Sequence, residues 1–89
     1  MELSVDISKY PLADEYKPAI KAFIERLQAV EGLVVECNTM STQVFGEYDL
    51  VMNTISAEMK RSFETYGKAI FVYKMIPGVN LDPALKPHG

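Results

Sequence analysis

A run of short polar side chains between residues 38 and 49 carries most of the chemistry that this sequence offers. Asn38, Ser41 and Gln43 supply amide and hydroxyl groups that donate and accept hydrogen bonds, and Glu47 adds a carboxylate. Such groups can fix a small polar ring in one orientation. The same residue types are also common turn formers, so a turn that leads into a half-exposed strand is the alternative interpretation.

The sequence offers few residues for disulfides, metal binding or catalysis. One cysteine, Cys37, and one histidine, His88, cannot form an internal disulfide or a Cys/His metal cluster. Cys37 alternates with apolar residues, so we expect it to be buried as a small hydrophobe. Asp6 and Glu47 could share a sheet face and act as acid and base, but solvated or ion-paired carboxylates are the more common arrangement. We therefore expect no catalysis, no metal and no cofactor.

Length and charge limit the class of protein. The 89 residues predict one domain, residues 1–78, followed by a C-terminal tail, residues 79–89. A net charge of −3 argues against a nucleic-acid partner, because such a partner requires a basic surface. The sequence begins with alternating rather than continuous apolar residues, so we expect no signal peptide, no membrane span and a cytoplasmic location.

Strand and helix patterns alternate along the chain. Residues 2–10 alternate apolar and polar side chains, which predicts a strand buried on one face. An apolar stripe at helical spacing predicts a helix from about Asp14 to Val30, with Gly32 ending it in a left-handed conformation. A second strand is expected at residues 33–37.

The second half repeats this order. A third strand is expected at residues 41–48. One of its two faces would carry the Gln43 amide and the Glu47 carboxylate, which are costly to bury. We therefore place the alternate residues on its buried face: Thr42, Val44, Gly46 and Tyr48. Asp49 is expected to cap a second helix that ends at Gly67, and residues 69–76 form the fourth strand.

This order, β-α-β-β-α-β, predicts an α+β, ferredoxin-like fold, in which both helices, each of roughly 15–17 residues, cover one face of a four-stranded antiparallel sheet. The fourth strand, at a sheet edge, is apolar on both faces. A second copy of the chain would cover the free face, so we expect a homodimer or homotetramer with Phe71 and Tyr73 at the contact. Scattered surface aromatics are the alternative.

Four stretches together resemble, in order and spacing, the YkoF-type thiamine/hydroxymethylpyrimidine-binding family: Val5–Leu12, Asn38–Thr42, Gly46 and Asp49–Val51. The resemblance extends from about residue 3 to residue 76. It implies ferredoxin-like units that pair through their sheets and bind thiamine or its pyrimidine without catalysis, in uptake or salvage. The best-known members carry two units in tandem, so a second copy would have to supply the other unit here. Lys9 departs from the family, which often has an aliphatic residue there.

The resemblance gives the polar run a role. Hydroxyls and amides match the ring nitrogens and exocyclic amine of an aminopyrimidine, an aromatic or Met side chain covers the ring, and Asp6 or Glu47 offsets the thiazolium charge. The expected ligand-binding residues are Ser8, Tyr10, Asn38, Met40, Ser41, Thr42, Gln43, Phe45 and Glu47. Of these, the ones that match family motifs are Ser8, Tyr10, Ser41 and Thr42. The alternative function is a structural or regulatory oligomer of the same fold without a small-molecule pocket.

Overall fold

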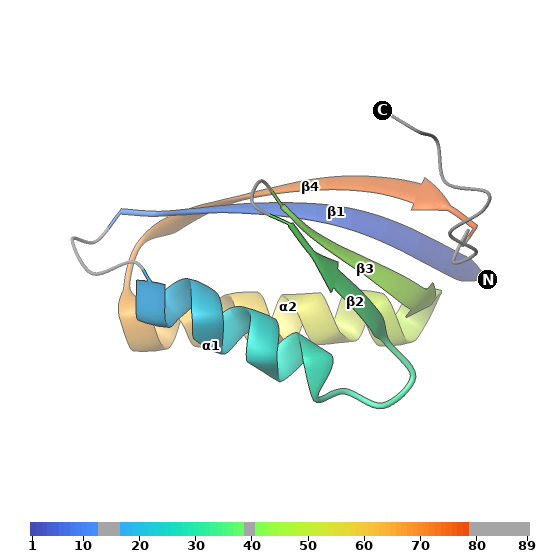
Figure 1. Ribbon diagram of the computed structural model, residues 1–89, viewed down its shortest axis with the longest axis horizontal. Coiled ribbons are helices and arrows are strands. Elements are labelled where there is room, and N and C mark those ends of the chain that lie inside the picture. The colour runs from blue at the N-terminus through green and yellow to red at the C-terminus, as the bar shows by residue number, and fades with distance from the viewer. Residues whose placement is uncertain (13–16, 39–40, 79–89) are drawn as a thin grey trace.

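The computed structural model describes residues 1–12, 17–38 and 41–78. Within these residues, four strands form one sheet and two helices pack against one of its faces (Figure 1). The elements, in chain order, are β1 (Glu2–Pro11), α1 (Lys17–Gln28), β2 (Val34–Cys37), β3 (Thr42–Glu47), α2 (Tyr48–Tyr66) and β4 (Ala69–Pro77). This is the predicted ferredoxin-like α+β fold, although α1 has 12 residues and α2 has 19, where similar lengths were expected. Asp14 and the predicted tail, residues 79–89, lie outside the described residues.

The sheet is antiparallel throughout, with strand order β2-β3-β1-β4. β1 is paired on both sides, whereas β2 and β4 form the two edges, as predicted for the fourth strand. The register places Val5 of β1 opposite Val44 of β3 and Met75 of β4. Because side chains that lie opposite one another share a face, this register decides which residues of all four strands meet the helices.

The core lies between the sheet and the helices. From β1, the buried residues are Leu3, Val5 and Ile7, as the alternation predicts. From the other elements, they include Phe23, Leu27, Val44, Val51 and Ile55. Burial of this apolar surface is the main term that stabilises the fold. Among the described residues, neither helix is long and apolar enough to cross a membrane.

β3 runs into α2 without an intervening loop. Glu47, the last residue of β3, is also the N-cap of α2, and its Oε2 accepts a hydrogen bond from the Leu50 N–H at 2.9 Å. The prediction that Asp49 caps this helix is wrong. Asp49 lies in the first turn, where an acidic side chain still interacts favourably with the helix dipole. Tyr48, expected on the buried face of the strand, is the first residue of α2 and is exposed.

Gly46 allows the chain to approach closely just before this junction. A Cβ at this position would lie 2.9 Å from Leu33 Cδ2 and 3.2 Å from the carbonyl oxygen of Gly32. The carbonyl belongs to the backbone and cannot rotate away, so a larger residue would push β3 off the turn that precedes β2. Gly67, with φ +86°, ends α2 as predicted.

The two faces of β4 are not equivalent. Phe71 faces the helices, and its ring centroid lies 5.3 Å from that of Phe23 and 5.4 Å from that of Phe63. Tyr73 stacks on Phe71 and also packs against the core. The prediction that Phe71 and Tyr73 lie at a contact with a second copy is therefore wrong, because the register turns both toward the helices. The exposed apolar residues of β4 on the uncovered face are Ile70, Val72 and Ile76.

Two further side chains differ from the predicted burial. Cys37, expected to be buried, is exposed, because it ends β2, an edge strand of four residues with a neighbour on one side only. Phe45, assigned to the outward set, is only 7% exposed. It lies in register with Val34 of β2 and Ser4 of β1 on the uncovered face.

Lys9 occupies a helix-facing position of β1, and its ammonium group lies between the sheet and both helices. Its Nζ donates to the carbonyl oxygen of Ala19 in α1 at 3.1 Å and to Oγ of Ser62 in α2 at 2.7 Å. It also lies 5.2 Å and 5.3 Å from the ring centroids of Phe23 and Phe71. These contacts offset part of the cost of burial, which lowers the pKa of Lys9.

The Tyr73 hydroxyl is buried without a hydrogen-bond partner in the described part of the chain, and burial raises the pKa of Tyr73 to about 12. Between pH 10 and pH 12 the unfolded chain would lose this proton while the folded chain keeps it, so stability falls as the pH rises. We expect Tyr73→Phe to raise the free energy of unfolding near neutral pH by up to about 1 kcal/mol. Tyr73→Phe should also reduce the loss of stability between pH 10 and pH 12, which urea unfolding at several pH values measures. Tyr10→Phe, at an exposed tyrosine, is the matched control, and equal behaviour of the two variants would contradict the prediction.

Candidate functional site

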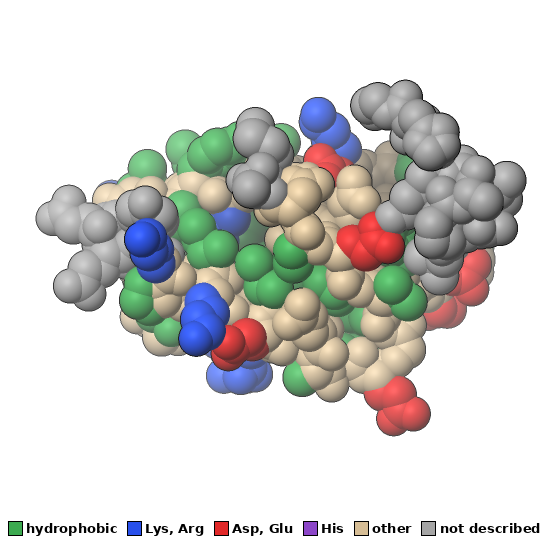
Figure 2. Space-filling model, in the orientation of Figure 1, with side chains coloured by type: hydrophobic (Ala, Val, Ile, Leu, Met, Phe, Trp, Pro, Cys, Tyr) green, Lys and Arg blue, Asp and Glu red, His purple; other side chains and the backbone are tan. Residues whose placement is uncertain are grey.

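The uncovered face of the sheet carries a line of polar side chains that crosses all four strands. Its members, one from each strand in register order, are Glu36, Gln43, Asp6 and Lys74; we call them the polar row. Two carboxylates, one amide and one ammonium give the polar row a net negative charge. Figure 2 shows this face along the upper edge of the molecule, where hydrophobic side chains gather over β1 and β4 and a basic side chain stands beside an acidic one.

Two predicted ligand-binding residues follow the polar row along β1. Ser8 lies two residues beyond Asp6 on the same face, in register with Val72 of β4. Tyr10 lies two residues further, in register with Ile70, and is exposed. Since two residues along a strand advance about 6.7 Å, the polar row, Ser8 and Tyr10 together span about 13 Å.

β3 brings two more predicted residues to this face. Gln43 lies in register with Asp6 and is half-buried. Phe45 lies in the next outward position of β3, on the side of the polar row away from Ser8. The uncovered face therefore joins amide, hydroxyl and carboxylate groups, with an aromatic ring on each side.

Thr42 lies on the other face of the sheet. It is in register with Ile7 of β1 and Cys37 of β2, and its Oγ1 donates to Cys37 Sγ at 3.9 Å. The regular pairing of Thr42 leaves no break in the pleat that would turn its hydroxyl toward Ser8 and Gln43. The predicted face of Thr42 is confirmed, and that face separates it from the polar row.

Asn38 and Ser41 hold each other across the turn between β2 and β3. The Ser41 N–H donates to Asn38 Oδ1 at 2.8 Å, and the Asn38 N–H donates to the Ser41 carbonyl oxygen at 3.0 Å. This is the turn chemistry that the alternative interpretation of the polar run expected. Met40 lies outside the described residues.

Glu47 lies at the far end of the site. It is in register with Glu2 of β1, six positions from Ser8, which corresponds to roughly 20 Å. The hydrogen bond from the Leu50 N–H lowers the pKa of Glu47, because it stabilises the charged carboxylate. With Glu47 serving as a helix cap, Asp6 is the carboxylate that lies beside Ser8.

Glu36 and Lys74 were not among the residues predicted to lie beside Asp6. Each is the polar residue in an otherwise apolar strand segment, which was the available signal. Their place beside Asp6 depends on strand register, and register is set by pairing across the sheet rather than by either segment alone.

No family model and no curated protein matches this chain. Solved structures share its fold at low identity. A protein from Streptococcus pneumoniae is 20% identical, with a TM-score of 0.81 over 94% of each chain. A "putative thiamine biosynthesis/salvage protein" from Thermotoga maritima is 16% identical, with a TM-score of 0.80 over 96% of each chain.

A domain of unknown function, DUF77, from Bacillus cereus is also similar, with 20% identity and a TM-score of 0.77 over 96% of this chain and 88% of that one. At these identities the likenesses show the fold alone. They include a protein named for thiamine, and they do not single out the YkoF type.

The cap on α2 gives a pH-dependent prediction. Because the pKa of Glu47 is lowered in the folded chain, its contribution to stability is present above the ordinary glutamate pKa and is lost as the pH falls through the folded value. We expect Glu47→Gln to lower the melting temperature at pH 7, and we expect the difference from wild type to shrink toward pH 3. Circular dichroism melts at several pH values measure this. Glu31→Gln, at an exposed carboxylate in the turn after α1, is the control; a pH-independent effect of Glu47→Gln would refute the capping role.

Proposed function

We propose that this chain binds thiamine or its hydroxymethylpyrimidine part on the uncovered face of the sheet, without catalysis, in uptake or salvage of that ligand. The observation that carries the proposal is the polar row with Ser8 beside it, flanked by Tyr10 and Phe45. The structural neighbour named for thiamine biosynthesis or salvage supports this choice of ligand.

The groups on this face match an aminopyrimidine. The ring nitrogens accept hydrogen bonds and the exocyclic amine donates them. Gln43 offers an amide donor and an amide acceptor, Ser8 offers a hydroxyl, and the Asp6 carboxylate accepts. Asp6 and the net negative charge of the polar row also offset the fixed positive charge of the thiazolium.

The proposal includes no chemical step. Asp6 has Gln43 on one side and Lys74 on the other, so the polar row does not pair a nucleophile with a base. Cys37 is a thiol on the opposite face, where it accepts a hydrogen bond from Thr42. Binding with selectivity is what this set of side chains supports.

Calorimetric titration of the wild-type chain with thiamine, and then with hydroxymethylpyrimidine, tests the proposal. Gln43→Ala should weaken both ligands by roughly 5–100-fold, from a loss of about 1–3 kcal/mol when a polar group of the ligand is left unpaired. Asp6→Asn should weaken thiamine more than hydroxymethylpyrimidine, because the pyrimidine alone lacks the thiazolium cation.

Thr42→Val is the matched control for these variants, since it removes a hydroxyl from the same strand on the helix-facing side. We expect it to leave both affinities near wild type. A wild-type chain that binds neither ligand at millimolar concentration would exclude the proposal. Loss of binding in Thr42→Val with normal binding in Gln43→Ala would place the ligand on the other face.

We also propose that a second copy of the chain covers the uncovered face and the β4 edge, as a homodimer or homotetramer. The exposed apolar residues on this face are Tyr10, Val34, Ile70, Val72 and Ile76. Exposed apolar residues on an edge strand, here Ile70, Val72 and Ile76 of β4, are a common site of association. If the second copy fills the whole face and leaves no space for a ligand, the chain is a structural or regulatory oligomer, which is the alternative function.

Light scattering tests this assembly. We expect a wild-type species larger than one chain at micromolar concentration, and a smaller species for Val72→Lys, because a charge would enter the apolar contact. Leu12→Lys, at an exposed residue outside the strands, is the control and should assemble like wild type. A monomeric wild-type chain under these conditions would contradict the prediction.

A further inference from the structure

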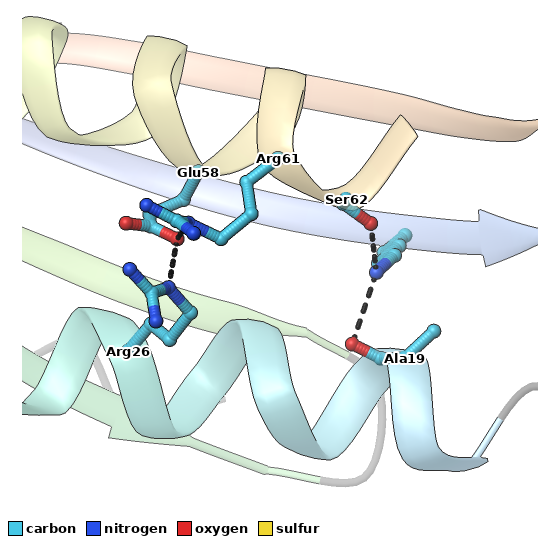
Figure 3. Close-up of polar contacts among 6 residues, drawn as sticks. Ala19, Arg26, Glu58, Arg61 and Ser62 are labelled. Atoms are coloured by element: carbon cyan, nitrogen blue, oxygen red, sulfur yellow. Dashed lines mark hydrogen bonds and ion pairs between the residues drawn. The ribbon is translucent and has the colours of Figure 1, made fainter. Parts of the chain in front are cut away.

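A groove of about 240 Å³ lies between α1 and α2, away from the polar row. Residues along both helices line it, and helix α1 runs antiparallel to α2 there, so Arg26 lies beside Glu58 while Ala19 lies near Ser62 (Figure 3). From Ala19 to Arg26 the groove follows about two turns of α1, or roughly 10 Å. Its volume suits a small organic molecule rather than a macromolecule.

One end of the groove is cationic. Both arginines of the sequence, Arg26 and Arg61, meet there on a single carboxylate oxygen of Glu58, with Nε–Oε1 distances of 2.5 Å and 3.3 Å. The contact of each arginine with Glu58 is made through Nε, and each guanidinium group also carries two Nη groups that can donate. Both arginine side chains are about half exposed, at 44% and 56%, and can meet a ligand from solvent.

At the other end of the groove, near Ala19 and Ser62, the ammonium group of Lys9 lies beneath the lining residues. Ser62 lines the groove, and its Oγ accepts a hydrogen bond from Lys9 Nζ at 2.7 Å. The Ser62 hydroxyl therefore retains its own proton for donation toward the groove. With three cations against one carboxylate, the groove and its support carry a net charge of +2 in a chain whose net charge is −3.

The middle of the groove is apolar. Ala22 and Phe23 of α1 line it between the two polar ends, and Tyr66 of α2 lines it one turn beyond Ser62. Phe23 is held in place by its contact with Phe71 beneath. An aromatic or short aliphatic body would find apolar contact there, with its charged group at the arginine end.

We propose that this groove binds a small organic oxyanion, a phosphate or carboxylate attached to an aromatic body. The groups that can donate here are the guanidinium groups of Arg26 and Arg61 and the hydroxyl of Ser62, and guanidinium groups match the geometry of oxyanions. Glu58 holds the two guanidinium groups together in advance, which reduces the ordering cost of binding. The proposal is independent of the thiamine proposal, which concerns a cation on the opposite face of the sheet.

Two-dimensional NMR of the ¹⁵N-labelled chain, titrated with phenyl phosphate, benzoate and benzylamine, tests the proposal. Phenyl phosphate or benzoate should shift the side-chain Nε–H signals of Arg26 and Arg61 and the amide signals of Ser62 and Tyr66. The stronger of the two anions identifies the head group. Benzylamine, a cation of similar shape, should leave these signals unchanged.

The double variant Arg26→Gln/Arg61→Gln should weaken the better anion by about tenfold or more, because two charged donors are lost. Lys60→Gln removes a positive charge from an exposed position of α2 outside the groove and should bind like wild type. Glutamine at both positions keeps a hydrogen-bond donor for Glu58, so both variants should fold, and circular dichroism checks this. Equal binding by the double variant and Lys60→Gln, or wild-type shifts confined to other residues, would overturn the proposal. Thiamine binding should be the same in the double variant and the wild type, which separates a failure of this proposal from a failure of the first.

Discussion

The alternation of side chains along β1 is the constraint on which the rest of the structure depends. β1 is paired on both sides, and its Leu3, Val5 and Ile7 are held beneath the helices. A shift of one residue would bring Asp6 and Ser8 into the core, at the cost of burying polar groups without partners. Because β3 and β4 pair with this fixed strand, the same constraint decides which of their residues face solvent. The polar row is thus a consequence of how the core is packed.

Element order and the faces of most strands could be predicted from the sequence, because apolar periodicity is a local signal. β1 shows this best, since Leu3, Val5 and Ile7 are all buried as expected. The errors lie where local signals compete. Phe71 and Tyr73 alternate with residues that are equally apolar, so only pairing with β1 decides which set faces the helices.

The candidate site was predictable in part for the same reason. Ser8, Gln43 and Phe45 share the uncovered face because each lies in a regular strand. The role of Glu47 was not predicted, because both Glu47 and Asp49 can cap a helix and the sequence favoured Asp49, whereas α2 is capped two residues earlier. The groove was not predictable, because no local pattern places Arg26 beside Arg61; antiparallel packing of the two helices brings them together.

β3 passes directly into α2, so a change in the direction of β3 at the junction would change the direction of the whole helix. A cap shared with the last strand residue leaves no flexible segment to absorb motion between Gln43 at one end and the far end of the helix. A helix of 19 residues is about 28 Å long, so a tilt of about 5° at the junction displaces its far end by roughly 2.5 Å. That end carries Ser62 and Tyr66. A tilt at the junction would therefore move this end of α2 more than the end that adjoins the sheet.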